Sequence, residues 1–235
     1  MISDTISMSR TSKIMTQYFS VGHVTCGIVF GFLFFLMGSY LPVIQFVQGA
    51  ENIVKCVGSD LCSGTEMDDV IIGNNASNTM TGLDGADVML GWDGDDSMSG
   101  GNRTDQMIGD EGDDKISGGD GSDEIIGGTG NDRISGGNGA DEILGGDGTD
   151  IILGNNGPDS IMGGASDDTI VGGLGTDTLN GEDGDDKIYQ GSVKSTSPDG
   201  SQDVIICGEG KDEVWLNFSV DRDLASDDCE IIHKG

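Results

Sequence analysis

A nine-residue period runs through more than half of the chain without an insertion or a deletion. From residue 64 to residue 189, fourteen consecutive nonapeptides follow the pattern G-x-x-x-x-D-x-[IML]-x, with Asn78 in place of the Asp in the second copy. Position 8 is apolar in every copy, whereas positions 7 and 9 are mostly polar or mixed. The pattern therefore predicts a very short strand at positions 7 to 9 with one inward side chain, preceded by a six-residue turn.

Two repeats are needed to bring the chain back above its start, because nine residues are too few to close a coil. At eighteen residues per coil and a strand spacing of ~4.8 Å, the fourteen repeats predict about seven coils and a rod roughly 30 to 35 Å long. The position-8 residues would form two parallel ladders, Ile71 to Leu179 from odd repeats and Met80 to Ile188 from even repeats. The predicted fold class is all-β, a parallel β-solenoid without a large globular core.

Stacked coils place the position-6 residues in two columns, one along each edge of the solenoid. The first column holds Asp69, Asp87, Asp105, Asp123, Asp141, Asp159 and Asp177. The second column holds Asn78, Asp96, Asp114, Asp132, Asp150, Asp168 and Asp186. Two charges ~5 Å apart repel each other by about 1 kcal/mol in water, and several-fold more at a lower effective dielectric. The columns therefore need a cation between their carboxylates.

Calcium fits this requirement best. It is a hard cation that takes about six to eight oxygen ligands, so it can bridge successive carboxylates and the carbonyl groups of glycine-rich turns. Glycine, which allows positive φ and close backbone approach, occupies position 1 in all fourteen repeats and position 4 in ten. Position 3 offers further oxygen ligands at Asp84, Asp93, Asp120, Asn138, Asp147, Asn156 and Asp183. Magnesium fits less well, because it demands a tight octahedron and keeps its waters.

The charge of the chain supports a cationic partner. There are 42 acidic residues against 11 basic ones, which gives a formal net charge of −31. This balance argues against nucleic acid and anionic membrane surfaces as partners. Such acidity is also typical of a disordered chain. Here, however, the acids lie at a fixed phase beside fixed apolar residues, which favours an ordered calcium array over a disordered chain or a purely structural glycine-rich solenoid.

The fullest copies, residues 118–126 and 136–144, read G-G-x-G-x-D-x-U-x. They resemble the RTX, or hemolysin-type, calcium-binding repeat, and the resemblance implies a right-handed parallel β-roll that binds several calcium ions. The tail Asp227-Asp228-Cys229-Glu230 also resembles the end of short secreted proteins that consist only of such repeats. We expect the best calcium occupancy within residues 109–157. Weaker sites are expected where the pattern is broken, at Asn78 and at the position-4 residues Met67, Ala76, Arg103 and Ser166.

The N-terminal segment is apolar. Arg10 and Lys13 precede residues 14–50, which contain no Asp, Glu, Lys or Arg, and small residues end this stretch at Gly49 and Ala50. This layout is typical of a secretory signal peptide that is cleaved after Gly49 or Ala50. The apolar run also approaches the roughly 20 residues of a bilayer span, so an uncleaved signal anchor, an N-terminal hydrophobic helix, is the alternative. In both cases the chain from residue 51 onward is expected outside the cell, with the membrane contacted only through an uncleaved N-terminal segment.

The cysteines agree with export. Cys56 and Cys62 precede the repeats, and Cys207 and Cys229 follow them. Four cysteines predict two disulfides, and pairing within each flank is favoured among the three possible connectivities. The predicted segments are a signal peptide or anchor (1–50), a disulfide-bearing N-terminal cap (51–63), the fourteen repeats (64–189), and degenerate repeats with a C-terminal cap (190–235).

The predicted function is calcium binding by a secreted or surface-anchored protein that folds when it meets calcium outside the cell. We expect a structural or adhesive role, with an unidentified cell-surface or matrix partner. The alternative is a remnant or relative of a secreted RTX toxin or hydrolase that lacks its catalytic domain. The sequence contains neither H-E-x-x-H nor G-x-S-x-G, so no enzyme activity is predicted.

Overall fold

A computed structural model describes residues 15–21, 24–30, 52–58, 61–191, 202–216 and 224–234. The chain divides into two compact units, Met1–Phe46 and Val47–Gly235. In the first unit, β1 (Met15–Val21) and β2 (Val24–Phe30) form an antiparallel pair. The expected N-terminal hydrophobic helix falls mostly on residues 31–50, which lie outside the described residues. In the described part of the chain, no helix is long and apolar enough to cross a membrane.

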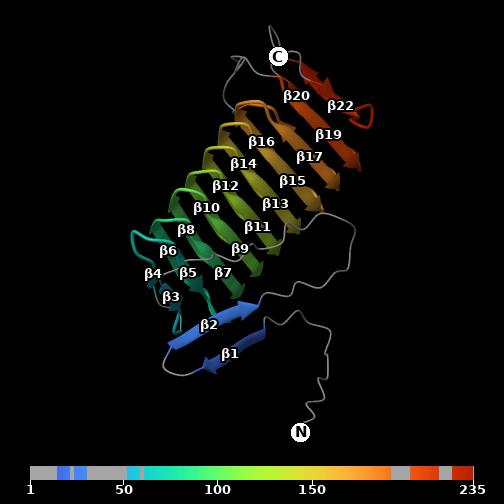
Figure 1. Ribbon diagram of the computed structural model, residues 1–235. Coiled ribbons are helices and arrows are strands. Elements are labelled where there is room, and N and C mark those ends of the chain that lie inside the picture. Colours follow the sequence, from blue (N-terminus) through green and yellow to red (C-terminus); the bar gives the residue numbers. More distant parts are fainter. Residues whose placement is uncertain are drawn as a thin grey trace. The chain divides into compact units, whose positions relative to one another are not determined.

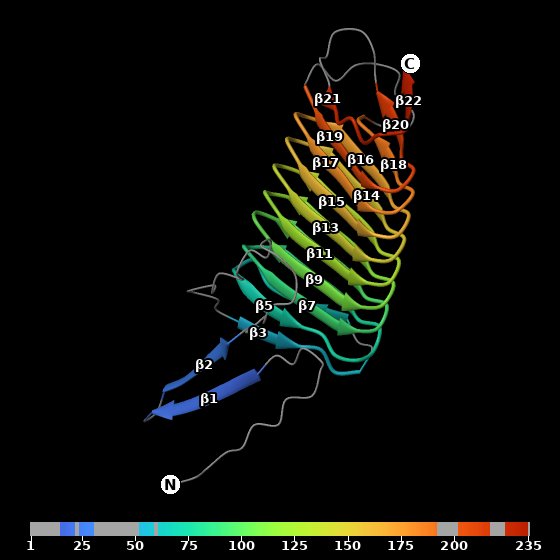
Figure 2. The same ribbon diagram turned by 90° about the vertical axis from the view of Figure 1, so that its right-hand side faces the viewer.

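The second unit is a β-solenoid built from two parallel sheets of ten strands each (Figures 1 and 2). We call them the odd and the even sheet after their strand numbers. The odd sheet contains β3 (Asn52–Lys55), β5 (Asp69–Ile72), β7 (Val88–Asp93), β9 (Gln106–Glu111), β11 (Glu124–Thr129), β13 (Glu142–Asp147), β15 (Ser160–Ala165), β17 (Thr178–Asp183), β19 (Val204–Glu209) and β21 (Leu224–Ala225). The even sheet contains β4 (Leu61–Ser63), β6 (Thr79–Asp84), β8 (Ser97–Asn102), β10 (Lys115–Asp120), β12 (Arg133–Asn138), β14 (Ile151–Asn156), β16 (Thr169–Leu174), β18 (Lys187–Tyr189), β20 (Glu213–Leu216) and β22 (Ile231–Lys234).

Successive repeats alternate between the two sheets, so each strand pairs with the strand two repeats away. Within the array the register is an offset of eighteen residues, as in Ile125↔Ile143 of the odd sheet and Ile116↔Ile134 of the even sheet. All fourteen position-8 side chains lie in one buried core cluster. The predicted all-β parallel solenoid and its two apolar ladders are confirmed. The fourteen repeats form seven turns, as expected, and the solenoid reaches about nine turns because coils continue on both sides of the repeats.

The strands are longer than the sequence pattern suggested. β11 contains six residues, positions 7 to 9 of one repeat and positions 1 to 3 of the next. The glycines at positions 1 and 2 therefore belong to the strand, and Gly128 pairs with Gly146. The turn is confined to the few residues around position 4, as at Gly139 with a φ of 144°, although φ is also positive at position 2 within the strand, as at Gly128 with a φ of 129°. The expected three-residue strand and six-residue turn were wrong because glycine was interpreted only as a turn former.

The outer faces of the two sheets differ in character. On the odd sheet, Glu124 and Glu142 are register neighbours, beside an aliphatic row of partly exposed position-9 residues. On the even sheet, Lys115 and Arg133 are register neighbours, and the position-9 residues beside them are Ser117 and Ser135. Near the C-terminal end of the even sheet, this position-9 row becomes a stack of aromatic rings. The ring of Trp215 lies 4.3 Å from that of Tyr189 and 4.6 Å from that of His233, between centroids.

Both flanks carry a disulfide. Cys56 pairs with Cys62, and Cys207 pairs with Cys229, so the favoured local connectivity is confirmed. The coil after the array also keeps its register. Val204 pairs with Thr178 across an offset of 26 residues, so the segment inserted after Tyr189 leaves the sheet intact. Trp215 and Leu216 contribute to this last part of the solenoid as expected, whereas Phe218 lies outside the described residues.

Candidate calcium sites

The position-6 carboxylates are buried between coils and not spread on the surface. Asp69, Asp105, Asp177 and Asp186 are 0% exposed, and their counterparts in the other repeats are at most 3% exposed. One carboxylate oxygen, Oδ1, accepts the backbone N–H of the position-6 residue one coil earlier. For example, Asp123 N–H donates to Asp141 Oδ1 at 2.9 Å and Asp132 N–H to Asp150 Oδ1 at 2.8 Å. This bond recurs along both columns at 2.6 to 3.0 Å.

The other oxygen, Oδ2, is buried without a hydrogen-bond partner among the described residues. This holds for Asp87, Asp96, Asp105, Asp114, Asp123, Asp132, Asp141, Asp150, Asp159, Asp168 and Asp186. A buried, unpaired carboxylate oxygen costs several kcal/mol relative to a solvated one. Each of these oxygen atoms is therefore stabilised by binding either a proton or a cation, and this situation recurs along both columns.

Position 1 leaves room for glycine alone. A Cβ added at a position-1 glycine would lie 2.1 to 2.7 Å from Oδ2 of the position-6 aspartate in the same repeat. It would also lie 2.3 to 3.0 Å from the position-1 carbonyl oxygen one coil later. A carboxylate oxygen and a carbonyl oxygen therefore approach position 1 so closely that only glycine fits there. We call these two oxygens and their surroundings the cradle of the repeat.

The buried carboxylates have raised pKa values. Burial, with a smaller contribution from neighbouring carboxylates, raises the pKa of Asp105 and Asp168 from 3.8 to about 8, although the backbone N–H bond lowers it. The same causes raise the pKa of Asp114, Asp150 and Asp159 to about 7. For Asp87, Asp96, Asp123 and Asp186 the pKa rises to about 6. Without a cation, Asp105 and Asp168 therefore favour the protonated form at neutral pH, whereas the carboxyl groups with a pKa of about 6 are mostly ionised.

The predicted position-3 ligands lie apart from the cradles, on the exposed edges. Asn138 donates through Nδ2 to Asp120 Oδ1 at 2.6 Å, and Asn156 donates to Asn138 Oδ1 at 2.6 Å. These side chains therefore bond to one another along the edge. Asp84 and Asp93 belong to the same two rows and accept hydrogen bonds from Asn102 and Asn75, respectively. The remaining two members, Asp147 and Asp183, are exposed.

A second ladder at position 5 was missed at the sequence level. Asp113 Oδ1 accepts the backbone N–H of Asn131 at 2.7 Å, and Asn131 Oδ1 accepts that of Thr149 at 3.1 Å. Likewise, Asp95 Oδ1 accepts the backbone N–H of Asp113, and Asp167 Oδ1 accepts that of Asp185. The signal was present, since Asp or Asn recurs at position 5 at eighteen-residue intervals on the even edge. These exposed side chains link the turns of successive coils by hydrogen bonds and lie outside the cradles.

The family model of the RTX calcium-binding nonapeptide repeat (four copies) matches residues 63–98, 99–134, 117–152, 126–161 and 153–188. The chain belongs to this family. RTX repeats imply calcium binding in a β-roll. No curated protein matches the chain.

The residues of the RTX cradles fit calcium. In eleven repeats the cradle offers a carboxylate oxygen without a partner among the described residues and a backbone carbonyl oxygen, which are hard donors of the kind that calcium takes. Cys207, Asp228 and Cys229 form the one other cluster of metal-ligand types in the described part of the chain. The two sulfur atoms of this cluster are joined in a disulfide, so they do not serve as thiolate ligands.

Proposed function

We propose that this RTX protein is a calcium-loaded β-roll outside the cell, whose folding depends on the ions it binds. The observation that carries the proposal is the row of buried Oδ2 atoms without partners in eleven internal repeats. The position-6 aspartates would hold the ions together with the position-1 carbonyl groups. Calcium would supply positive charge between stacked carboxylates. The position-3 side chains predicted as ligands remain candidates for contacts with the same ions or with their waters.

Folding would be coupled to calcium binding because, without the ions, the folded solenoid gains too little free energy to offset the cost of ordering the chain. Ordering the glycines of the array costs conformational entropy, and most nonapeptides bury only one large apolar side chain in return. The buried carboxylates add repulsion along each column. A ligand that binds the folded state and not the unfolded chain shifts this balance by mass action. Scarce calcium inside the cell would leave the chain unfolded, and millimolar calcium outside would fold it.

Circular dichroism of the full chain, in chelator and after addition of millimolar calcium, tests this coupling. We expect conversion from coil to β-structure on addition of calcium and a much weaker response to the same concentration of magnesium. A β-spectrum that is equally strong in chelator would defeat the folding switch. Isothermal titration calorimetry without heat of calcium uptake would defeat the proposed sites themselves.

The extracellular location and the structural or adhesive role are part of the same proposal. They are supported by the charge-free apolar stretch at residues 14–50, by the two disulfides, and by the calcium supply that the cradles require. Mass spectrometry of the native N-terminus distinguishes cleavage near Ala50 from an intact signal anchor. A pull-down in calcium and in chelator would identify a surface or matrix partner that recognises only the folded roll.

A further inference from the structure

Seven repeats carry Asp or Asn at position 3 and Gly at position 4, and we call them the Asx–Gly pairs. They begin at Asp84, Asp93, Asp120, Asn138, Asp147, Asn156 and Asp183. Glycine has no Cβ, so nothing hinders the attack of its backbone nitrogen on the side chain before it. Six of the seven Asp or Asn side chains are exposed to water, and that of Asp93 is partly exposed. The pairs are therefore candidates for covalent modification.

The modification is the formation of a succinimide ring, which needs neither an enzyme nor an oxidant. The Gly139 nitrogen attacks Cγ of Asn138, a new N–Cγ bond forms, and the Cγ–Nδ2 bond breaks. Ammonia leaves with the proton that the Gly139 nitrogen has lost. At an Asp–Gly pair, water leaves from the protonated carboxyl group instead. A water molecule then opens the ring at one of two bonds. Breaking the N–Cγ bond yields Asp, whereas breaking the bond from nitrogen to the main-chain carbonyl carbon yields isoaspartate.

The folded solenoid holds the attacking nitrogens in place. Within the described array, six of the seven position-4 N–H groups donate to the position-3 carbonyl oxygen one coil later, at 2.6 to 3.0 Å. Gly139 N–H, for example, donates to the carbonyl oxygen of Asn156 at 2.8 Å. Such a hydrogen bond opposes the loss of the amide proton that the attack requires, and an unmade backbone bond is costly. Stacking of the coils therefore protects the pairs.

The side chains that would be attacked are also held by neighbouring coils. Asn138 Nδ2 donates to Asp120 Oδ1 at 2.6 Å, and Asn138 Oδ1 accepts a hydrogen bond from Asn156 Nδ2 at 2.6 Å. Both polar atoms of the Asn138 amide are thus engaged, one by the coil before it and one by the coil after it. Ring formation expels Nδ2, so it would break the first of these bonds.

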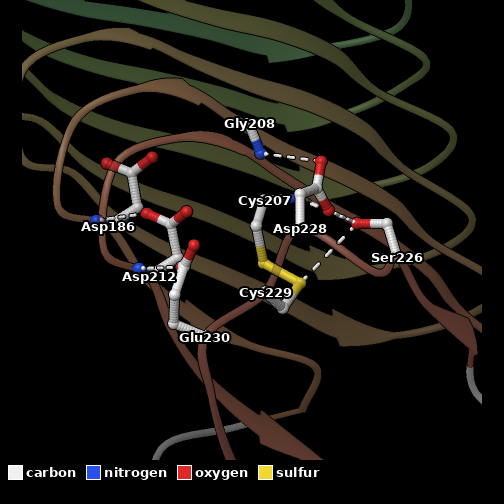
Figure 3. Close-up of a disulfide and its surroundings, with 8 residues drawn as sticks. All are labelled: Asp186, Cys207, Gly208, Asp212, Ser226, Asp228, Cys229 and Glu230. Carbon is white, nitrogen blue, oxygen red and sulfur yellow. Dashed lines mark hydrogen bonds between the residues drawn. A yellow bond between two sulfur atoms is a disulfide. The ribbon is translucent and has the colours of Figure 1, made fainter.

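Neither disulfide restrains the pairs once the coils separate. The two disulfides close the loops 56–62 and 207–229, and all seven pairs lie between these loops. The C-terminal disulfide joins Cys207 to Cys229 beside Asp228, an aspartate that precedes a cysteine and not a glycine (Figure 3). Protection of the Asx–Gly pairs consequently depends on the stacking of the array itself and not on its covalent ends.

We propose that the Asx–Gly pairs are sites of spontaneous deamidation and isoaspartate formation, which proceed in the open chain and are suppressed by coil stacking. Isoaspartate adds one atom to the main chain at position 3, where Asp120 pairs with Asn138. The modified coil no longer matches the register of its neighbours, so a chain that stays open loses its ability to refold completely. Control of this reaction by calcium rests on the proposed function, because calcium would then decide how long the chain is open.

Peptide mass spectrometry of the full chain, incubated at mildly alkaline pH in calcium, in chelator and in urea, measures deamidation site by site. We expect Asn138 and Asn156 to react at least about tenfold more slowly in calcium than in urea, because only the open fraction of a folded chain reacts. Circular dichroism of the same samples reports whether the chain in chelator is open, and its rate should follow that state.

The spectra separate the two possible failures. Equal rates in calcium and urea, for a chain with β-signal in calcium, would overturn the proposal, as would the absence of deamidation in urea. A chain that is β-structured and slow to react in chelator as well would refute the calcium-driven folding switch and support protection by stacking. A chain without β-signal in calcium would refute the proposed function, and with it the protected state that the proposal requires.

A matched pair of variants tests the role of glycine. Asn102 lies at position 3 on the same edge as Asn138, but Arg103 follows it, so it should react much more slowly in urea. Arg103→Gly should bring the Asn102 rate in urea to that of Asn138 and leave Asn102 slow in calcium. Asn138→Gln should suppress the reaction at that residue alone, since its longer side chain would have to form a six-membered ring. An Asn102 rate unchanged by Arg103→Gly would contradict the assignment of the Asx–Gly pairs.

Discussion

At the scale of single residues, the two oxygens of each position-6 carboxylate have different roles. In Asp132, Oδ1 accepts the N–H of Asp114 at 2.8 Å, whereas Oδ2 faces the cradle at Gly127. The repeat pattern predicted the aspartate columns and the need for glycine. It did not predict this division, because the orientation of a carboxylate depends on the coil above and below it. The position-3 side chains were predicted to bind calcium from their residue types alone. In the structure, their oxygen atoms lie on the outer edges of the solenoid.

The substitution Gly127→Ala tests the cradle. The new Cβ would lie 2.3 Å from Asp132 Oδ2 and 2.5 Å from the carbonyl oxygen of Gly145. We expect the loss of one bound calcium ion and a lower melting temperature in calcium. Thr129→Ala, an exposed change two residues further along the strand, is the control and should retain both. An alanine variant with the wild-type ion count would show that these two oxygens do not hold an ion.

Arg103 is a strained residue next to the acid column. It occupies position 4 with a φ of 77°, in the left-handed region that costs a non-glycine residue roughly 1 kcal/mol. Arg103→Gly should raise the melting temperature in calcium by about 2 to 4 °C, the shift expected for 1 kcal/mol in a chain of this size. Arg103→Ala removes the charge but keeps the strain, so thermal melts of both variants separate the two effects. Equal melting temperatures for all three proteins would contradict the strain argument.

At the scale of elements, the strands are held by the position-8 ladders and by register. The strict nine-residue period was sufficient to predict which residues face inward and that alternate repeats stack. It could not predict strand ends, because glycine at position 2 continues the backbone pairing without contributing a side chain to the pattern. The degenerate repeats expected after the break do continue the sheet, as the pairing of Leu179 with Ile205 shows.

Two neighbouring residues of β11 separate core packing from strand propensity. Ile125 is 1% exposed in the inner ladder, whereas Ile126 lies on the outer face and is only partly buried. Ile125→Ala should lower the free energy of unfolding in calcium by about 2 to 5 kcal/mol, the usual cost of removing a buried isoleucine side chain. Ile126→Ala should cost much less. Denaturant titration in excess calcium measures both, and similar losses would contradict the assigned inner and outer faces.

At the scale of the whole molecule, the buried carboxylates couple the fold to pH as well as to calcium. Their pKa values in the folded state are raised above 3.8, by burial first and by neighbouring carboxylates as well. Protonation therefore stabilises the metal-free roll. This contribution is fully present below pH about 4 and is lost as the pH rises through the folded values of about 6 to 8. The sequence indicated repulsion between the carboxylates but could not show how deeply they are buried.

Acidification should consequently replace part of the effect of calcium. In metal-free solution, we expect the β-signal in circular dichroism to increase as the pH is lowered from 8 to 5. With calcium present, protons compete for the same oxygens, so the calcium concentration at half-saturation should rise over the same range. Loss of β-structure on acidification of the metal-free protein would contradict the raised pKa values. Calorimetric titrations at pH 8 and pH 6 provide the second measurement.

The alternation of repeats between two sheets restricts how such a gene can change length during evolution. Deleting one nonapeptide between Lys115 and Glu142 would transfer every later side chain to the opposite sheet and place Glu142 on the basic face that carries Lys115. Deleting two nonapeptides would keep the acidic side chains on the odd sheet and the basic side chains on the even sheet. Descendants that keep distinct faces should therefore differ by even numbers of repeats, while the aspartate edges, being alike, tolerate either change.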